Sequence, residues 1–443
     1  MTATPKKELS LFDSTSIIVG IIIGAGIYQM APTIAKGAFC WWGVLLIWAA
    51  GGILSLCGAA CYAELATAYP KEGGDYVYLS RSYGKWAGFL FGWAQLTIVR
   101  PGDIAIMAFA FATYARAVYD PFINHPASAY SQQIFAAGAA AILTAINILG
   151  VKEGKWVQNI LTAVKALGLL AIVGVAFVSP GNPVNTGSFG SIPVSLALIF
   201  VLFTYGGWNE MAYVAAEVKN PNRNITRALL FGTAAVIILY LLVNGAFLYT
   251  LGFNGLANSQ AVAADSIATV FPKSAGSLIS ALVCISALGA VNGLIFTGAR
   301  ISYAMGAEHP AFGILGRWHR LTGTPAWSLL VQGVIAITLI LAFGSFVDTI
   351  LYTAPAVYAF YLASSLSVIV LRKKEPDVER PYRVTGYPFT PVIFSAVCAI
   401  LIYSAVAYAA VNKPVSLVVL LATLLAGLLV YRLERFFSPA NLR

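Results

Sequence analysis

Long runs of apolar residues, separated by short polar segments, cover most of this chain of 443 residues. We interpret each run of roughly 17 to 25 apolar residues as a helix that crosses a membrane. The runs predict twelve spans, over residues 12–34, 41–66, 86–115, 132–150, 156–178, 194–216, 225–250, 274–304, 326–344, 346–371, 389–411 and 414–431. Because a helix satisfies its own backbone hydrogen bonds in lipid, the expected fold is an all-α polytopic membrane protein.

Two of the predicted spans are interrupted by glycine. Gly24-Ala25-Gly26 breaks the first span, and Tyr205-Gly206-Gly207 breaks the sixth. A glycine inside a helix costs about 1 kcal/mol relative to alanine, and unwound backbone at membrane depth requires surrounding protein or a water-filled cavity. We therefore expect helices one and six to be broken, with a binding site between them. The alternative is that these glycines only allow close helix packing, as in the overlapping Gly20-xxx-Gly24 pattern.

The spans divide into two blocks of five, residues 12–178 and 194–371, separated by a polar stretch. Because five is odd, the second block enters the membrane from the opposite face to the first. This is the arrangement of a 5+5 inverted repeat, in which substrate binds where the two broken helices meet near the middle of the bilayer. Residues 389–431 supply two further spans, and residues 1–11 and 432–443 form the predicted cytoplasmic ends.

The composition agrees with a membrane protein, since 59% of the residues are hydrophobic, 10% are charged and the mean hydropathy is +0.81. A net charge of +10 would also suit nucleic acid binding. With the N-terminus inside, however, 21 of the 27 basic residues fall in segments on the cytoplasmic side. The positive-inside rule explains this excess, puts both termini in the cytoplasm and removes the reason to expect nucleic acid as a partner.

The ends of the half-helices predict what the site binds. The N–H groups around Ala25, Gly26 and Ile27 lack partners inside the helix and carry the positive end of a helix dipole, which suits a carboxylate. The carbonyls of Phe203 and Thr204 end the other half-helix, and their partial negative charge suits an ammonium. Together the two breaks predict a receptor for the backbone of an α-amino acid.

Aromatic residues flank both breaks. Tyr28 follows the first, and Phe203, Tyr205 and Trp208 surround the second. We expect them to line a small pocket, with Phe203 as the gate that closes over the substrate. Aromatic residues are also common at membrane interfaces and in packing, which is the alternative for each one alone.

Ionisable residues inside spans are costly and usually face an interior site. Lys165 lies well inside span five, where a lysine costs about 2.5 to 3.5 kcal/mol on insertion scales. Its ammonium could replace a bound sodium ion next to helix-end carbonyls, or it could be a structural partner. Arg100 and Asp103 in span three could form an internal ion pair, which we read as mainly structural. Glu210 is a candidate proton acceptor or cation-selecting group, unless it is solvated or ion-paired.

Motifs of enzymes are missing from the sequence. The three histidines fall in predicted loops, and no Ser/His/Asp grouping, phosphate-binding loop or HExxH motif occurs. The five cysteines lie in or beside apolar spans without the spacing of a metal site. We therefore expect neither an enzyme nor a bound cofactor or metal.

Six segments carry a resemblance to a known family. They are VGIIIGAGIY, CYAELATAYPKEGGDYVYL, VRPGDIAIMAFAFATY, LFTYGGWNEMAYVAAEVKNPNRNI, GAVNGLIFTGAR and ERPYRVTGYPFTPVIF. With these segments the chain resembles the amino acid-polyamine-organocation superfamily and, within it, the L-type amino acid transporter group. The resemblance implies a LeuT-like fold whose helices one and six are broken.

The resemblance also assigns roles to residues of this chain. It implies that the substrate carboxylate binds the backbone at Gly24, Ala25 and Gly26, and that the ammonium binds carbonyls of Ile22, Phe203 and Thr204. With the helix-end argument, the candidate substrate-binding residues are Ile22, Gly24, Ala25, Gly26, Ile27, Phe203, Thr204 and Gly206. Lys165 matches a lysine understood to replace sodium and to link spans one and eight through Ser286, and Tyr240 matches its tyrosine neighbour.

Two departures from the group bear on partners and substrate. Eukaryotic light subunits have a cysteine after span three that bonds a heavy chain, but residues 117–130 contain none, so a stand-alone prokaryotic-type member is expected. Members often have serine at the position of Ala25 and an aromatic at that of Glu210, which leaves side-chain preference open.

The predicted function is sodium-independent exchange of small or medium neutral L-amino acids across a plasma or bacterial inner membrane. The expected partners are a small-molecule amino acid and the lipid bilayer. The alternatives are a proton-coupled amino acid symporter and a cationic amino acid or polyamine carrier. A channel or nutrient receptor has less support, because neither charged pore rings nor a signalling domain is visible in the sequence.

Overall fold

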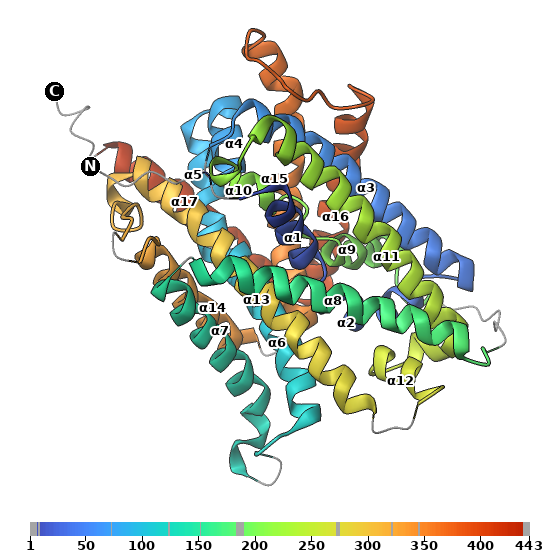
Figure 1. Ribbon diagram of the computed structural model, residues 1–443. Helices are drawn as coiled ribbons and strands as arrows, with labels where there is room; N and C mark the ends of the chain where they lie inside the picture. Colours follow the sequence, from blue (N-terminus) through green and yellow to red (C-terminus); the bar gives the residue numbers. More distant parts are fainter. Residues whose placement is uncertain are drawn as a thin grey trace.

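The computed structural model describes residues 7, 9–71, 73–122, 125–150, 152–182, 190–271, 275–319, 322–343 and 346–436. Parts of the predicted ends, residues 1–11 and 432–443, thus lie outside the described residues. The described part is helical, and its only extended pairings are two isolated bridges, Leu9 with Val218 and His319 with Thr324. Figure 1 shows the helices packed against one another in one bundle.

The helices fall in the following order. The first half of the chain contains α1 (Leu11–Ile22), α2 (Gly26–Lys36), α3 (Trp41–Ala68), α4 (Asp75–Tyr83), α5 (Lys85–Ala94), the π-helical η1 (Gln95–Val99), α6 (Arg100–Val118), the short η2 (Pro126–Tyr130), α7 (Ser131–Leu149) and α8 (Lys152–Val178). The second half contains α9 (Val194–Thr204), α10 (Glu210–Tyr213), the short η3 (Ala215–Glu217), α11 (Pro221–Asn258), α12 (Val262–Ala268), α13 (Ala275–Glu308), the short η4 (Pro310–Phe312), α14 (Ala326–Phe343), α15 (Phe346–Lys374), α16 (Phe389–Asn412) and α17 (Pro414–Phe436).

Most of these helices suit a membrane. Within the described residues, nine are long and apolar enough to cross one, and the bent pair α1 and α2 makes a tenth. α9 and residues 326–342 of α14 are apolar but shorter. The prediction of an all-helical polytopic membrane protein is therefore confirmed. The count of twelve spans and the inverted repeat between residues 12–178 and 194–371 remain predictions.

Both predicted breaks occur in the structure. α1 ends at Ile22, α2 begins at Gly26, and the two helices are bent by 47°. At the second break α9 ends at Thr204, and turns lead into the four-residue helix α10 at Glu210. Gly207 has a φ of 112° there, a conformation that is accessible to glycine but strained for other residues.

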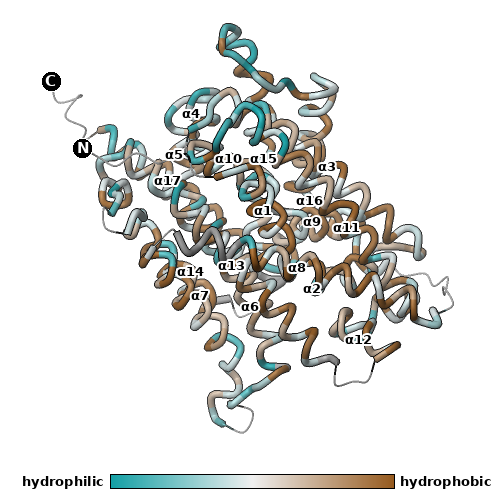
Figure 2. The backbone as a smooth tube through the Cα atoms, in the orientation of Figure 1, coloured by the Kyte–Doolittle hydropathy of each residue, from teal (hydrophilic) through white to brown (hydrophobic). Residues whose placement is uncertain are grey.

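The helices differ in how far they are buried. In the most apolar stretch of residues 85–116, which comprise α5, η1 and α6, 78% of the residues are buried, against 17% in α17. Leu421, Leu425 and Leu429 of α17 are exposed, which suits contact with apolar lipid tails. Figure 2 shows apolar colouring along the helices and hydrophilic colouring near α4 and in the linker after α15. α6 is therefore central, and α17 is peripheral.

The predicted cytoplasmic segments share one end of the bundle. In Figure 1, α4 and the linker after α15 lie at one end, whereas the turn after α6 and α12 lie at the other. This separation agrees with the sidedness that the basic residues predict.

Glu64, near the end of α3, anchors the linker after α15. Its buried carboxylate accepts two hydrogen bonds from Arg372, at 2.8 and 2.6 Å, and one from the backbone N–H of Val384 at 2.7 Å. Nε of Arg380 lies 3.5 Å from the same carboxylate. A two-point contact between arginine and carboxylate fixes orientation as well as distance. The linker is thus held against α3.

Replacing Glu64 by glutamine is expected to lower the melting temperature of the purified protein. The variant keeps the size of the side chain but removes the charge that faces Arg372 and Arg380. A hydrogen bond to a charged group contributes about 1.5 to 3 kcal/mol, so the free energy of unfolding should fall by a similar amount. Glu379→Gln is the matched control, because Glu379 is exposed on the same linker. Equal losses in both variants would contradict the anchoring role of Glu64.

Candidate functional site

The two helix breaks lie against each other in the interior. A Cβ atom built on Gly26 would be 3.5 Å from Cα of Thr204, and one built on Gly207 would be 2.6 Å from Cγ2 of Ile21. At Gly207 this close approach depends on the missing side chain of glycine, whereas the backbones of Gly26 and Thr204 meet at ordinary van der Waals distance. Segments far apart in the sequence therefore form one junction, which we call the break junction: residues 21–27 and 203–210.

The first break exposes backbone donors. The N–H groups of Ala25, Gly26 and Ile27 have no hydrogen-bond acceptor within the described part of the chain, whereas the N–H groups of Tyr28 and Gln29 already bond the Ala25 carbonyl at 3.1 and 3.0 Å. Three adjacent donors at the start of α2 are the arrangement that binds an anion. The sequence analysis predicted that these same three N–H groups bind a carboxylate.

The second break presents carbonyl oxygens. The carbonyl of Phe203 accepts the N–H of Gly206 at 2.8 Å, and this bond closes the turn. The carbonyl of Thr204 receives no backbone N–H from the described residues. The hydroxyl of Thr204 bonds back to Phe200 at 2.7 Å, so only its backbone oxygen is available at the helix end. The negative end of the α9 dipole therefore lies at the junction.

Side chains from three other helices satisfy the last carbonyls of α1. The bonds are Lys165 Nζ of α8 to the Gly20 carbonyl at 2.8 Å, Tyr240 OH of α11 to the Ile22 carbonyl at 2.7 Å, and Ser286 Oγ of α13 to the Ile23 carbonyl at 3.2 Å. Lys165 is fully buried. A helix that ends inside a membrane leaves its last carbonyls without internal donors, and these three side chains supply them.

Gly289 of α13 makes room for the lysine. A Cβ atom at this position would lie 2.8 Å from both Cε and Nζ of Lys165. α8 and α13 can therefore meet around the lysine stem only with glycine at this position. Lys165 thus touches α13 at Gly289, one turn from Ser286, while it bonds α1.

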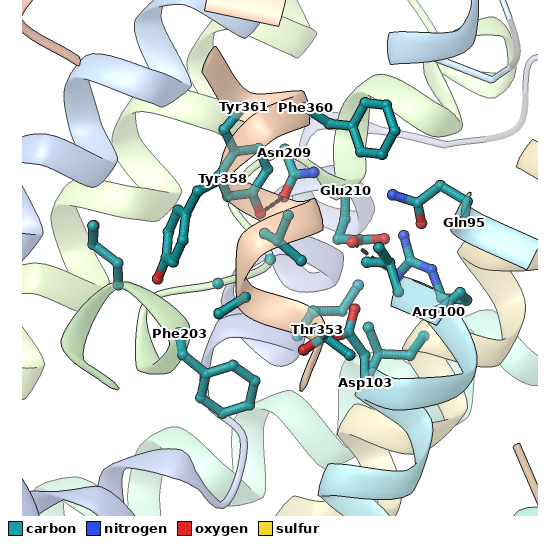
Figure 3. Close-up of a pocket in the computed structure, with 18 of the residues that line it drawn as sticks. Gln95, Arg100, Asp103, Phe203, Asn209, Glu210, Thr353, Tyr358, Phe360 and Tyr361 are labelled. Atoms are coloured by element: carbon teal, nitrogen blue, oxygen red, sulfur yellow. Dashed lines mark hydrogen bonds and ion pairs between the residues drawn. The ribbon is translucent and has the colours of Figure 1, made fainter. Parts of the chain in front are cut away.

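A cavity lies beside the break junction (Figure 3). Ile21, Phe203, Gly206 and Gly207 contribute the junction side of its wall. α6, α13 and α15 contribute much of the rest. Its polar lining consists of Tyr62, Gln95, Arg100, Asp103, Asn209, Glu210, Tyr213, Thr353, Tyr358 and Tyr361. The cavity therefore combines apolar walls with a few polar groups, as ligand sites usually do.

Arg100 forms its ion pair with Glu210, and not with Asp103, the partner that the sequence made possible. Nη1 of Arg100 lies 2.9 Å from the Glu210 carboxylate, which also accepts the Thr297 hydroxyl at 2.5 Å (Figure 3). Sequence spacing favoured Asp103 because it lies three residues away on the same helix. The fold instead brings Glu210 of α10 to α6, and Arg100 and Glu210 are both buried. The structure thus agrees with the alternative interpretation of Glu210, an ion-paired carboxylate.

A second buried carboxylate, that of Asp75, bonds residues of the cavity lining without lining the cavity itself. Asp75, at the start of α4, accepts hydroxyls from Tyr62, Ser364 and Tyr213, the last at 2.8 Å. Asn209 bonds the same Tyr213 hydroxyl at 2.7 Å. Burial raises the pKa of Asp75 to about 6, although these hydroxyl donors lower it. The network joins Asp75, which lies between the second and third predicted spans, to residues that line the cavity.

The structure separates the predicted site residues into three positions. Phe203, Gly206 and Glu210 line the cavity. The backbone groups of Ile22, Gly24, Ala25, Gly26, Ile27 and Thr204 lie at the break junction. Lys165, Tyr240 and Ser286 lie around the end of α1. No group of three His, Cys, Asp or Glu side chains suitable for a metal occurs in the described ranges.

Of the four aromatic residues expected in the pocket, only Phe203 lines the cavity. Tyr205 packs against Trp48 and Tyr240, with ring centres 5.8 and 5.2 Å apart. Trp208 packs against Tyr62 and Tyr361 at 5.2 and 5.0 Å. Tyr28 is buried outside the lining. Three of these aromatic residues therefore support the junction instead of facing the cavity.

The contribution of α15 was missed from the sequence. Thr353, Tyr358 and Tyr361 of this helix line the cavity, and the Tyr358 hydroxyl bonds the Ile199 carbonyl at 3.0 Å. The available signal was the recurrence of hydroxyl side chains on one side of an apolar span. It was weak, because tyrosine is also common in membrane helices for packing and interface contacts.

Replacing Gly207 by alanine is expected to destabilise the purified protein. The φ of 112° is strained for alanine, and the new methyl would lie 2.6 Å from Ile21 Cγ2 and 3.2 Å from the Ile22 nitrogen. Strain of this kind costs about 1 to 3 kcal/mol, so the melting temperature should fall. Gly245→Ala in α11 is the control, because nothing lies within 4 Å of its Cβ position. An unchanged melting temperature in Gly207→Ala would show that the two breaks do not pack as described.

Comparison with known proteins gives a consistent result. The profile of a family described as "Amino acid permease" matches residues 9–429. The chain is 34% identical over 410 residues to the b(0,+)-type amino acid transporter 1 of Mus musculus, covering 90% of this chain and 83% of that protein. It is 31% identical over 448 residues to the Large neutral amino acids transporter small subunit 2 of Homo sapiens, covering 98% of this chain and 81% of that protein.

These matches extend across both helix breaks and nearly the whole helical bundle. The relatives are named as transporters, which favours a transporter over an enzyme for this chain. The all-helical fold, with several helices able to cross a membrane, is the form such a protein requires. The chain therefore belongs to the amino acid permease family, with relatives among the light-subunit amino acid transporters.

Proposed function

We propose that this protein is a sodium-independent exchanger of L-amino acids that works by alternating access, with small and medium neutral amino acids among its substrates. The break junction carries the proposal. Three adjacent N–H donors at Ala25, Gly26 and Ile27 lie next to helix-end carbonyls of the second break. An α-amino acid has the complementary pair of groups, one carboxylate and one ammonium. Either group alone would suit many ligands, but the pair suits this class.

The position of Lys165 supports transport that does not depend on sodium. Its ammonium is fully buried and bonds the last-turn carbonyl of Gly20, while Ser286 bonds that of Ile23. Helix-end carbonyls are the ligands that coordinate sodium in transporters with broken helices. A fixed ammonium in such surroundings supplies a positive charge without an ion. We propose that it holds α1 against α13 during transport.

Phe203 is proposed as the gate. It is half-buried and lies on the wall of the cavity next to Gly206 (Figure 3). A side chain there can swing over a substrate that is bound at the junction. Transport would then proceed by rocking one group of helices against the other around the occupied site.

A proton-coupled mechanism through Glu210 has less support. Glu210 contacts both Arg100 and Thr297 at hydrogen-bond distance. The Glu210 carboxylate is therefore already engaged by two protein partners, an ion pair with Arg100 and a hydrogen bond from Thr297. Uptake driven by an imposed pH gradient and abolished in Glu210→Gln would nevertheless favour the symporter.

The protein is proposed to act in the plasma or bacterial inner membrane with both termini cytoplasmic, and without a disulfide-linked heavy chain. The positive-inside pattern supports the orientation. Residues 117–130, after the third predicted span, contain no cysteine, which supports the stand-alone form. One human relative is named as a small subunit, so the oligomeric state should be measured on the purified protein.

Reconstitution into proteoliposomes tests the exchange mechanism. Labelled alanine is expected to enter vesicles that contain unlabelled alanine, at the same rate in sodium and in choline buffers. Vesicles without internal amino acid should show little uptake, because the empty carrier does not complete its cycle. Uptake that needs sodium would overturn the proposed role of Lys165. Equal uptake into empty vesicles would overturn exchange but not amino acid transport.

Replacing Lys165 by alanine is expected to reduce alanine exchange by at least about tenfold, because a carbonyl of α1 loses its donor in a dry interior, at a cost of roughly 1 to 3 kcal/mol. Sodium should not restore the activity if the ammonium itself is required. Lys219→Ala is the control, since Lys219 is exposed. Exchange is measured with equal amounts of folded protein, checked by size-exclusion chromatography. Normal exchange in Lys165→Ala would remove this residue from the mechanism.

A further inference from the structure

Asp103 is the one carboxylate of the cavity lining that the observed ion pairs leave without a partner. The lining contains three charged side chains, Arg100, Asp103 and Glu210. Arg100 and Glu210 pair at 2.9 Å, and Thr297 adds a further bond to Glu210. Asp103 takes part in no ion pair or hydrogen bond among the described residues. With all three groups ionised, the cavity holds one net negative charge.

Arg100 makes its close contacts with residues other than Asp103. Its guanidinium carbon lies 5.5 Å from the ring centre of Tyr213, and Nη1 bonds Glu210. Asp103 lies one turn further along α6. In the view of Figure 3, Asp103 lies between Arg100 and Phe203, beside Thr353. α15 approaches closely here, since a Cβ atom on Gly102 would be 2.4 Å from Cγ2 of Thr353. α6 and α15 therefore pack closely at the residue next to Asp103.

Met107 relates the position of Asp103 on α6 to the break junction. Met107 lines the cavity, and its sulfur would lie 3.1 Å from a Cβ atom on Gly24. Asp103 precedes Met107 by four residues on α6, so both share one face of the helix, about 6 Å apart along its axis. An extended lysine side chain reaches about 6 Å from its Cα through staggered bonds of about 1.5 Å. A substrate held at the junction could thus bring a basic group to Asp103.

We propose that Asp103 is a specificity-determining residue that binds the positively charged side chain of basic amino acid substrates, such as arginine and lysine. The inference rests on the proposed function, because it requires the substrate backbone to bind at the break junction. The charges of Arg100 and Glu210 cancel, so a basic side chain would neutralise the remaining negative charge of Asp103. Neutral amino acids use the junction alone, so the substrate range includes both classes.

Arginine and citrulline provide a matched pair of probes, since they differ mainly in the charge of a planar side-chain end. Both compete with labelled alanine for uptake into proteoliposomes that contain the full chain. In the wild type, arginine is expected to compete about 30-fold better than citrulline, as for a charge pair that is partly removed from water. In Asp103→Asn the ratio should fall close to one while alanine uptake changes only a few-fold. Asp265→Asn is the control, because this carboxylate lies in α12, outside the cavity lining.

Binding in detergent keeps the proposal testable if Asp103→Asn does not transport. Arginine should raise the melting temperature of the wild type more than citrulline does, and this difference should disappear in the variant. An Asp103→Glu variant should retain the preference for arginine. An unchanged arginine-to-citrulline ratio in Asp103→Asn overturns the proposal. Equal competition by both probes in the wild type, with a pH dependence of alanine uptake that Asp103→Asn removes, overturns it in favour of a proton site.

The same experiment tests the role of Asp103 separately from the proposed exchange of amino acids. A wild type that transports alanine but ignores arginine overturns the role of Asp103 and leaves the proposed exchange of neutral amino acids intact. A wild type whose labelled uptake responds to no amino acid overturns the proposed function itself.

Discussion

Unwound backbone in the interior of a membrane protein must find hydrogen-bond partners, and the rest of this site depends on that constraint. α1 stops at Ile22, where its last carbonyls have no further helix to supply donors. Lys165, Tyr240 and Ser286 supply those donors from three different helices. α8, α11 and α13 are therefore all hydrogen-bonded to the end of α1 at the break. Among the described residues, the backbone donors at the start of α2 have no such protein partners, and we propose that a ligand binds them.

Charge inside the bundle follows the same logic. Burying an unpaired charge is costly, and the cost falls when hydrogen bonds or an opposite charge accompany it. Arg100 has Glu210, and Glu210 also has Thr297. Glu217 pairs with Arg300 at 2.6 Å in the same region. Asp103, by contrast, takes part in no ion pair or hydrogen bond within the described part of the chain, and ionisable side chains that face an interior site are where substrate chemistry is expected.

The polar groups also connect the site to one end of the molecule. Tyr213 lines the cavity and bonds Asp75, which begins the helix after the predicted cytoplasmic loop. Ser364 and Tyr62 hold the same carboxylate from α15 and α3. Glu64, also on α3, holds the linker that follows α15. Rearrangement of helices around the cavity would therefore alter contacts at this end as well.

The sequence by itself determined the membrane fold, the two helix breaks and the chemical groups at their ends. These features are local, because hydropathy, glycine content and helix-end polarity depend on neighbouring residues alone. Only the tertiary structure decided that Arg100 pairs with Glu210, that Tyr205 and Trp208 face away from the cavity, and that α15 lines it. These contacts join residues more than one hundred positions apart, and a spacing rule along one helix cannot anticipate which distant helix arrives beside it.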